Sequence, residues 1–251
     1  MARQRTPEGP PPPPAVQKLR VRYAKRGRLR FSSTRDFARA LERALRRSGV
    51  PMAFSAGFHP HPKISYANGA ATGAASEAEY FEIHVTERVD PEAVRKALDE
   101  ALPDGIDVLE VVEAGGTGAL ADRLEASEWQ LEFPDVDAAE LEAAVATFLA
   151  ADQVEVTRTF KRGPRTFDAR EAVERAWLTE SSDPSCAILR MVVRHTTPAV
   201  RPDDVLTALR LVAQFSPARS PRVTRVIQGT WDPAAARVAD PLAADKHAAG
   251  T

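Results

Sequence analysis

Two kinds of hydrophobic spacing alternate along this chain, and their order limits the folds that it can adopt. Residues 18–24 alternate polar and apolar side chains, which is the two-residue period of a half-buried strand. The next segment repeats its apolar side chains every three or four positions, the period of a helix with one buried face. This alternation predicts an α+β fold. The apolar helix positions are Phe37, Ala40, Leu41, Ala44 and Leu45.

The first half of the chain has the pattern strand, helix, two strands, helix and strand. We expect the opening strand to continue through residues 28–31 after a turn at Gly27. One of the hydroxyl residues 32–34 can cap the following helix, and Gly49 ends it. This is the split βαβ order of ferredoxin-like domains. The remaining elements are strands at residues 63–67, 80–85 and 106–111, and a helix that Pro91 opens.

The same order of elements returns in the second half, without an evident repeat of sequence. A connection containing Trp177 separates a predicted hairpin from the later strands. The sequence therefore predicts two ferredoxin-like (βαββαβ) domains in tandem. The expected strands are residues 128–133, 154–160, 165–168, 187–195 and 223–231, and the expected helices are residues 138–151 and 202–213.

Composition shifts set the expected domain boundaries. Residues 1–15 include a proline run with too few apolar residues to fold, and we expect a disordered proline-rich arm there. The first domain is expected to span residues 16–114 and the second residues 126–232. Residues 115–125 contain a glycine cluster that lacks the spacing of a phosphate-binding loop, so they are expected to be a linker. Residues 233–251 are alanine-rich and are expected to be a disordered tail.

The net charge of −1 conceals an uneven distribution of charge. Residues 16–49 hold many basic side chains and only two acidic ones, Asp36 and Glu42. Such a concentration of positive charge is typical of a surface that meets an anionic partner. On the predicted helix, at 100° per residue, four arginines share one exposed face. The basic residues are Lys18, Arg20, Arg22, Lys25, Arg26, Arg28, Arg30, Arg35, Arg39, Arg43, Arg46 and Arg47.

Residues 54–66 are too polar and too rich in proline for a core, and they are expected to form a presented loop. They contain His59, His61 and Lys63. Two histidines without a nearby carboxylate cluster do not make a metal site, so no metal is predicted. A histidine with a pKa near neutrality could instead act as a general base beside an RNA 2′-hydroxyl group. Phosphate or partner contacts by Lys63 and one histidine are the third reading.

A second basic segment contains Lys161, Arg162 and Arg165 at the tip of the predicted hairpin in the second half. Tips of this kind are often merely solvated. Together with the first basic surface, however, this one could hold a single phosphate backbone, because affinity grows with the number of phosphate contacts.

Cys186 is the only cysteine, which excludes an internal disulfide and an iron–sulfur cluster ligated by cysteines of this chain. No cofactor is therefore predicted. The N-terminal residues have no apolar signal region, and no apolar run approaches membrane-spanning length. We expect a cytoplasmic protein without membrane contact.

Several motifs resemble those of the radical-SAM-linked protein family, a domain of unknown function, in its stand-alone form. The first motifs are residues 29–32 with Asp36, and residues 41–49. The Gly-Phe-His-Pro-His-Pro-Lys run at residues 57–63 is the most specific one, and residues 77–80, 161–163 and 167–170 complete the set. The resemblance spans residues 16–231 and implies a radical-SAM protein as a partner. Because this chain lacks the cysteines, any radical chemistry would belong to that partner.

Two departures from the family pattern concern the first half. The family usually has a histidine where this chain has Ser33 or Thr34, and a Leu-Pro-rich segment where residues 68–74 stand. The first departure argues against a catalytic role at that position. The absence of the Leu-Pro-rich segment at residues 68–74 argues against a rigid loop there.

These observations predict an RNA-binding accessory module for RNA modification or processing, without catalytic activity of its own and with a radical-SAM enzyme as candidate partner. Two alternatives remain open: a metal-independent endoribonuclease that uses His59 or His61, and a protein-interaction adaptor with no nucleic-acid role. The residues predicted to contact RNA are Arg20, Arg22, Arg35, Arg39, Arg43, Arg46, His59, His61, Lys63, Lys161, Arg162 and Arg165.

Overall fold

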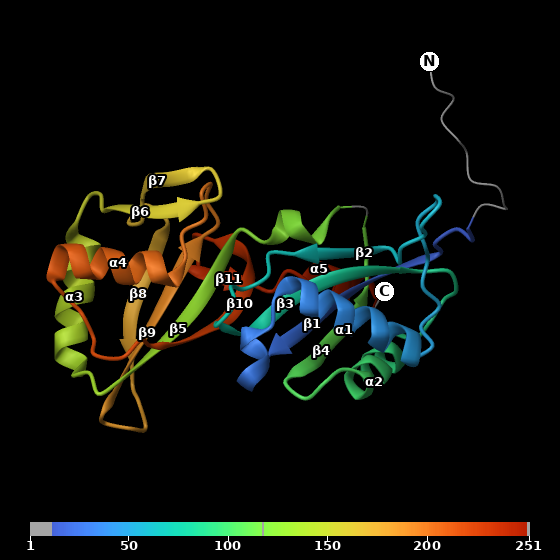
Figure 1. Cartoon of the computed structure of the whole chain (residues 1–251), viewed down its shortest axis with the longest axis horizontal. Helices are drawn as coiled ribbons and strands as arrows, with labels where there is room; N and C mark the ends of the chain where they lie inside the picture. Colours follow the sequence, from blue (N-terminus) through green and yellow to red (C-terminus); the bar gives the residue numbers. More distant parts are fainter. Residues whose placement is uncertain (1–11, 117, 250–251) are drawn as a thin grey trace, which may run out of the picture. The chain divides into compact units, whose positions relative to one another are not determined.

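The computed structural model describes residues 12–116 and 118–249 of the chain, which fold as two compact α+β units (Figure 1). Of the described residues, the first unit contains those up to Thr72, those within Ala78–Asp122, and those from Leu242 onward. The second unit contains Gly73–Glu77 and Arg123–Pro241.

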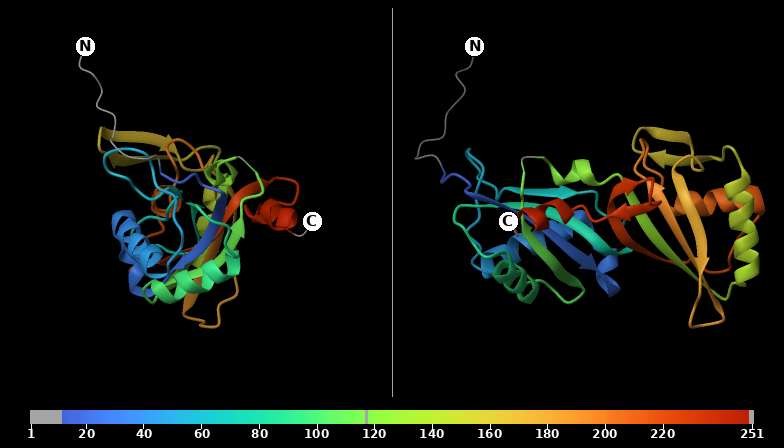
Figure 2. Two further views of the ribbon diagram at one scale, coloured as in Figure 1. Left: turned by 90° about the vertical axis from the view of Figure 1, so that its right-hand side faces the viewer. Right: turned by 180° about the vertical axis from the view of Figure 1, so that it is seen from behind.

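The first unit is built on a sheet with the strand order β4-β1-β3, and β2 also pairs with β3. Helices α1 and α2 lie on one face of this sheet, and α5 lies on the other (Figures 1 and 2). The core between the sheet and α1 and α2 includes Leu19, Leu41, Phe81 and Leu98, all fully buried. The elements are β1 (Gln17–Lys25), α1 (Thr34–Arg47), β2 (Ile64–Ala67), β3 (Ala75–Val85), α2 (Pro91–Ala101), β4 (Ile106–Glu113) and α5 (Ala243–Ala249), with the 3₁₀ turns η1 (Gly27–Phe31) and η2 (Leu120–Arg123).

Helix α1 begins and ends where its local signals predict. Ser33 is its N-cap, and the Ser33 hydroxyl accepts a hydrogen bond from the Asp36 backbone N–H (3.2 Å), while Asp36 accepts one from the Ser33 N–H (3.2 Å). This reciprocal capping box satisfies two N–H groups of the first turn. Gly49 follows the C-cap with φ of +67°, a conformation that favours glycine.

Residues 28–31 do not continue the first strand as the alternation predicts. They form the 3₁₀ turn η1, in which the Leu29 N–H donates to the Arg26 carbonyl (3.0 Å) and the Ser32 N–H donates to the Leu29 carbonyl (2.9 Å). The prediction was wrong because four residues are too few to distinguish a strand period from a single turn.

The second unit has a sheet with the strand order β10-β5-β9-β8, and β11 also pairs with β10. Ala75 and Ser76, the first residues of β3, pair in parallel with Thr224 and Arg225 of β10, whereas β5 pairs antiparallel with β9 and β10. The sheet is therefore mixed. The elements are β5 (Ala126–Pro134), α3 (Ala138–Ala150), β6 (Glu155–Phe160), β7 (Gly163–Asp168), β8 (Val173–Thr179), β9 (Cys186–Arg194), α4 (Pro202–Ala213), β10 (Arg222–Asp232) and β11 (Arg237–Ala239).

The predicted connection containing Trp177 is a strand, β8, which pairs with β9 of the main sheet. Strands β6 and β7 instead form a separate two-stranded sheet. The strand period of β8 is hidden because the charged residues Glu174 and Arg175 stand side by side after Val173. The hairpin strands alternate more regularly, so the pattern favoured them for the main sheet.

The expectation of a disordered tail at residues 233–251 was also wrong. Residues 237–239 form β11 and residues 243–249 form α5, with Leu242 fully buried and Asp245 1% exposed. Isolated anchors of this kind give no periodic signal in an alanine-rich sequence. Of the expected proline-rich arm, residues 1–11 lie outside the described residues, and residues 12–16 have no regular secondary structure. No helix in the described part of the chain is long and apolar enough to cross a membrane.

Candidate nucleic-acid interface

The exposed face of α1, called here the helix surface, carries Arg35, Arg39, Arg43 and Arg46. All four are exposed, whereas the opposite face of the helix is buried in the core. The side chain of Arg46 forms an ion pair with Glu42 (3.6 Å). Within the described residues, the other three form no hydrogen bond or ion pair. They follow one another every four residues, about 6 Å apart along the axis, and so present a row of positive charge, of which Asp36 offsets a part beside Arg35 and Arg39.

The segment at residues 54–63, called here the histidine loop, lies between α1 and β2 (Figure 1, light blue). Its stem is fixed to β3: the Ala53 N–H donates to the His84 carbonyl (2.8 Å), and the His84 N–H donates to the Lys63 carbonyl (3.2 Å). Across the stem, the Lys63 N–H donates to the Ala53 carbonyl (2.8 Å). The base of the loop is therefore ordered by backbone hydrogen bonds against the sheet.

The outer part of the histidine loop presents basic and aromatic side chains together. His59, His61 and Lys63 are exposed, and Phe54 and Phe58 expose 41% and 61% of their surface. Exposed aromatic rings beside cations are the groups on which unstacked bases rest in single-stranded RNA complexes. The loop thus combines phosphate-binding and base-stacking groups.

The endoribonuclease alternative depends on the imidazole rings of His59 and His61. Neither imidazole ring has a hydrogen bond among the described residues. General base catalysis normally relies on a second group that orients the ring. The described residues also contain no group of three or more histidine, cysteine or acidic side chains that could hold a metal ion.

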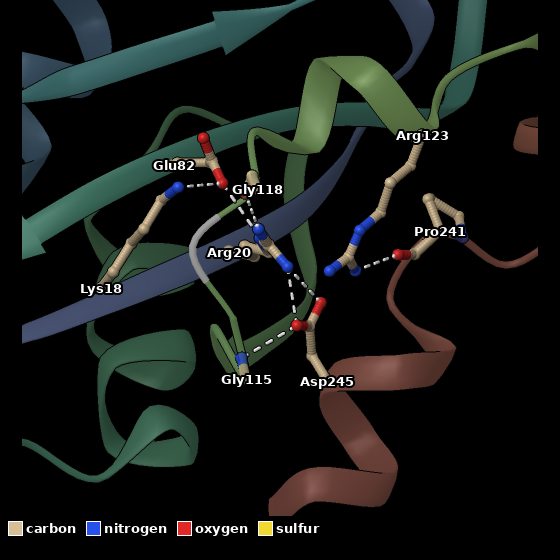
Figure 3. Close-up of polar contacts among 8 residues, drawn as sticks. All are labelled: Lys18, Arg20, Glu82, Gly115, Gly118, Arg123, Pro241 and Asp245. Atoms are coloured by element: carbon tan, nitrogen blue, oxygen red, sulfur yellow. Dashed lines mark hydrogen bonds and ion pairs between the residues drawn. The ribbon is translucent and has the colours of Figure 1, made fainter.

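Arg20 does not belong to an exposed surface, contrary to the prediction. Its side chain is fully buried, and its guanidinium group is held on three sides (Figure 3). The Nε atom donates to Glu82 (2.9 Å), Nη1 donates to both carboxylate oxygens of Asp245 (2.6 and 2.8 Å), and Nη2 donates to the Gly118 carbonyl. The Gly115 N–H also donates to Asp245 (2.9 Å). The Nε, Nη1 and Nη2 atoms of Arg20 all donate to partners within the chain and the side chain is fully buried, so the guanidinium group is not available to RNA.

The neighbours of Arg20 explain why the alternation of β1 wrongly predicted an exposed basic face. Helix α5 supplies Asp245 and covers the sheet face on which the basic residues of β1 lie (Figure 3). Lys18 forms an ion pair with Glu82 (2.7 Å), and Arg22 is half-buried. The basic face of β1 is therefore largely a structural network.

Protonation equilibria in this network follow from burial and pairing. Burial alone would raise the pKa of Glu82, but the hydrogen bonds from Lys18 and Arg20 outweigh it, and the pKa of Glu82 is lowered. The pKa of Arg20 is raised, because its bonds to Asp245 and Glu82 outweigh the opposing effect of burial. Burial, followed by the charges of Lys18 and Lys63, lowers the pKa of nearby His84. The network is therefore built from ionised acidic and basic groups.

The β6–β7 hairpin of the second unit, called here the hairpin surface, carries the second predicted set. Lys161, Arg162 and Arg165 are exposed at and near its tip. The guanidinium group of Arg165 lies 5.6 Å from the centroid of the Phe160 ring, and that ring packs at 6.4 Å against Phe167. Basic and aromatic groups are thus combined here as they are in the histidine loop.

Sequence reasoning missed the exposed aromatic ring of Phe31, which the expected strand would have placed in a sheet. Phe31 is 58% exposed at the end of η1, and the Arg30 guanidinium lies 4.6 Å from its ring centroid. The basic and aromatic order of residues 28–31 is a signal that could have indicated a contact surface.

The sequence model of the family DUF2344, described as uncharacterized proteins conserved in bacteria, matches residues 18–202. The chain belongs to this family. The DUF2344 match includes the helix surface, the histidine loop and the hairpin surface, and it ends before β10, β11 and α5. No curated protein has a sequence that matches this chain.

Among solved structures, the cryo-EM structure of the encapsulated DyP-type peroxidase from Mycobacterium smegmatis is similar over 91% of this chain and 94% of that chain. The sequence identity is 10% and the TM-score is 0.19.

Proposed function

We propose that this DUF2344 protein binds RNA, as an accessory module for RNA modification or processing. The observation that carries the proposal is the row formed by Arg35, Arg39 and Arg43, exposed and without an ion pair among the described residues. A row of like charges slightly destabilises an isolated helix, and a phosphate backbone would relieve that repulsion. The histidine loop and the hairpin surface add cations next to aromatic rings, which suits single-stranded RNA.

We also propose that each unit is a ferredoxin-like domain. In the first unit the support is the element order βαββαβ, with strands in the order β4-β1-β3 and β2 on β3. In the second unit, β10-β5-β9-β8 repeats that arrangement if the β6–β7 hairpin is an insertion between α3 and β8. Such domains supply open surfaces to many unrelated functions, so the fold alone does not argue for RNA.

The partner proposal is that a radical-SAM enzyme supplies the chemistry. Its support is the resemblance of residues 57–63 and the accompanying motifs to the radical-SAM-linked family. Cys186 is buried and is the single cysteine, so this chain cannot hold a cysteine-ligated cluster by itself. In this proposal the chain binds and presents RNA while its partner performs the reaction.

The RNA proposal predicts a steep dependence of affinity on salt. Between three and seven cationic contacts with single-stranded RNA would give a slope of about −2 to −5 when log Kobs is plotted against log salt concentration. Fluorescence anisotropy of a labelled 12-nucleotide RNA measures this slope from 50 to 300 mM salt. A slope near zero would contradict the proposal and favour the protein adaptor.

The same samples distinguish the endoribonuclease alternative. In EDTA, an accessory module leaves the bound RNA intact over hours, as gel electrophoresis would show. Cleavage that disappears in His59→Ala or His61→Ala would instead assign the chemistry to the histidine loop.

A further inference from the structure

A small cleft lies in the first unit beside the N-terminal end of α1. Its volume is about 250 Å³, and none of its lining residues is among those that the sequence predicts to contact RNA. The cleft lies between the first turn of the helix, the end of β2 and the loop that follows β2. Its lining includes Tyr23, Lys25, Phe37, Tyr66, Gly69 and Glu79.

Three aromatic rings form a rigid group in this cleft. The rings of Tyr23 and Phe37 are stacked, with centroids 4.3 Å apart and planes 7° apart. The Tyr66 ring meets Phe37 edge-on at 6.1 Å and remains 41% exposed. Because the other two rings are buried beneath it, Tyr66 is held at the mouth with one part open to solvent. A flat ligand could stack there without rearrangement of the core.

Polar groups converge on the same cleft from its other wall. Glu79 is 2% exposed and accepts a hydrogen bond from the Ala70 N–H (3.1 Å), and Lys25 is 5% exposed and donates to the Ala70 carbonyl (3.3 Å). A carboxylate and an ammonium group are thus fixed at one loop. Burial, and then the charge of Glu42, raises the pKa of Tyr66 to about 12, so its hydroxyl stays protonated near neutral pH. The wall is therefore polar and is lined by a carboxylate, an ammonium group and a neutral hydroxyl.

The size and charge of the cleft limit its ligand. Pockets for drug-sized ligands span roughly 300 to 1,000 Å³, so this cleft has room for one ring system. Asp36 already occupies the N-terminus of α1 through its capping box with Ser33, and the Glu79 carboxylate offsets the charge of the Lys25 ammonium group, so the cleft has no excess positive charge. A phosphate group is disfavoured there. A neutral, planar heterocycle with polar edges satisfies both limits.

We propose that this cleft binds one unstacked nucleobase of a single-stranded RNA whose phosphates lie on the helix surface. The inference rests on the proposed RNA function and adds a base-binding site to it. Thr34 lines the cleft and Arg35 is the next residue, so the row of arginines begins at the rim. The ring of Phe31 is exposed just before the lining residue Ser32 and offers a neighbouring stacking surface.

Filling the cleft tests this inference. A Cβ atom on Gly69 would meet the Glu79 Oε2 atom at 3.6 Å, an ordinary contact, so Gly69→Leu places a side chain in the cleft beside Glu79 without backbone strain. Gly116→Leu is the matched control, because a Cβ there meets nothing within 4 Å. The probes are a uridine hexamer and a hexamer of abasic nucleotides, which keeps the phosphates and removes the bases.

The intact hexamer should bind the natural protein about 5- to 100-fold more tightly than the abasic one, the range expected from stacking of one base. Gly69→Leu should weaken binding of the intact hexamer and leave binding of the abasic hexamer and the salt slope unchanged, whereas Gly116→Leu should change none of these. If Gly69→Leu does not fold, Tyr66→Ser removes the ring instead, and the same loss is expected. Equal binding of both hexamers with a normal salt slope would overturn the cleft and the base-stacking role of the histidine loop, but not the phosphate contacts of the helix surface. Absence of binding to either hexamer would overturn the proposed RNA function itself.

Discussion

Arg20→Leu is expected to lower the free energy of unfolding by about 3 to 5 kcal/mol, the usual effect of breaking a buried ion pair from one side. The substitution leaves the Glu82 and Asp245 carboxylates, which are 4% and 1% exposed, without their shared guanidinium group. It also removes the donor to the Gly118 carbonyl. Urea denaturation followed by circular dichroism measures the change in the free energy of unfolding.

Arg88→Leu is the matched control for this loss. Arg88 also pairs with a carboxylate, that of Glu113 (2.9 Å), but its side chain is 71% exposed, and exposed pairs contribute about 0 to 1 kcal/mol. If Arg20→Leu were no more destabilising than Arg88→Leu, Arg20 would not be a structural residue. The prediction that it contacts RNA would then need to be reconsidered.

The double variant Arg39→Glu/Arg43→Glu is expected to weaken RNA binding at least tenfold at low salt. Each lost contact with a charged phosphate removes about 1.5 to 3 kcal/mol, and a tenfold change needs only about 1.4 kcal/mol. Repulsion by the new carboxylates adds to the loss. The salt slope should also become shallower by about 1.4, because roughly 0.7 is lost for each contact. Fluorescence anisotropy with the same labelled RNA measures both quantities.

Arg88→Glu/Lys96→Glu changes the net charge by the same amount elsewhere in the first unit. Arg88 and Lys96 are exposed, with 71% and 65% of their side chains accessible, and they lie outside α1 and the histidine loop. Near-natural RNA affinity of this control is expected. Equal losses in the two double variants would show that binding follows net charge rather than the helix surface, and would contradict the proposed interface.

Local signals predicted helix α1 well. The Ser33 and Asp36 capping box and the turn at Gly49 are short-range features that sequence spacing displays directly. The helix surface followed from the same periodicity, because burial of one face leaves the opposite positions exposed. The exposed hairpin tip at Lys161 and Arg162 could also be predicted from a local signal, the polar turn between two strand-like segments.

Long-range contacts account for the failures. Arg20 occupies a polar position of an alternating strand, but its partner Asp245 lies 225 residues later in an alanine-rich segment with no helical period. The cleft has no local signature either, since β1, α1, β2 and β3 each contribute a few residues to it. Only the folded chain brings Lys25, Tyr66 and Glu79 to one cleft.

The claim that this DUF2344 chain binds RNA through its basic and aromatic surfaces is tested most directly by photo-crosslinking in lysate of the cells that produce it. The protein is recovered with and without nuclease, and crosslinked peptides are mapped by mass spectrometry. The account predicts nuclease-sensitive RNA crosslinked in one of three segments. These are the histidine loop (residues 54–63), the part of the cleft lining at residues 66–70, and residues 160–167 of the hairpin surface. Recovery of a stoichiometric protein partner with no RNA above background would contradict it.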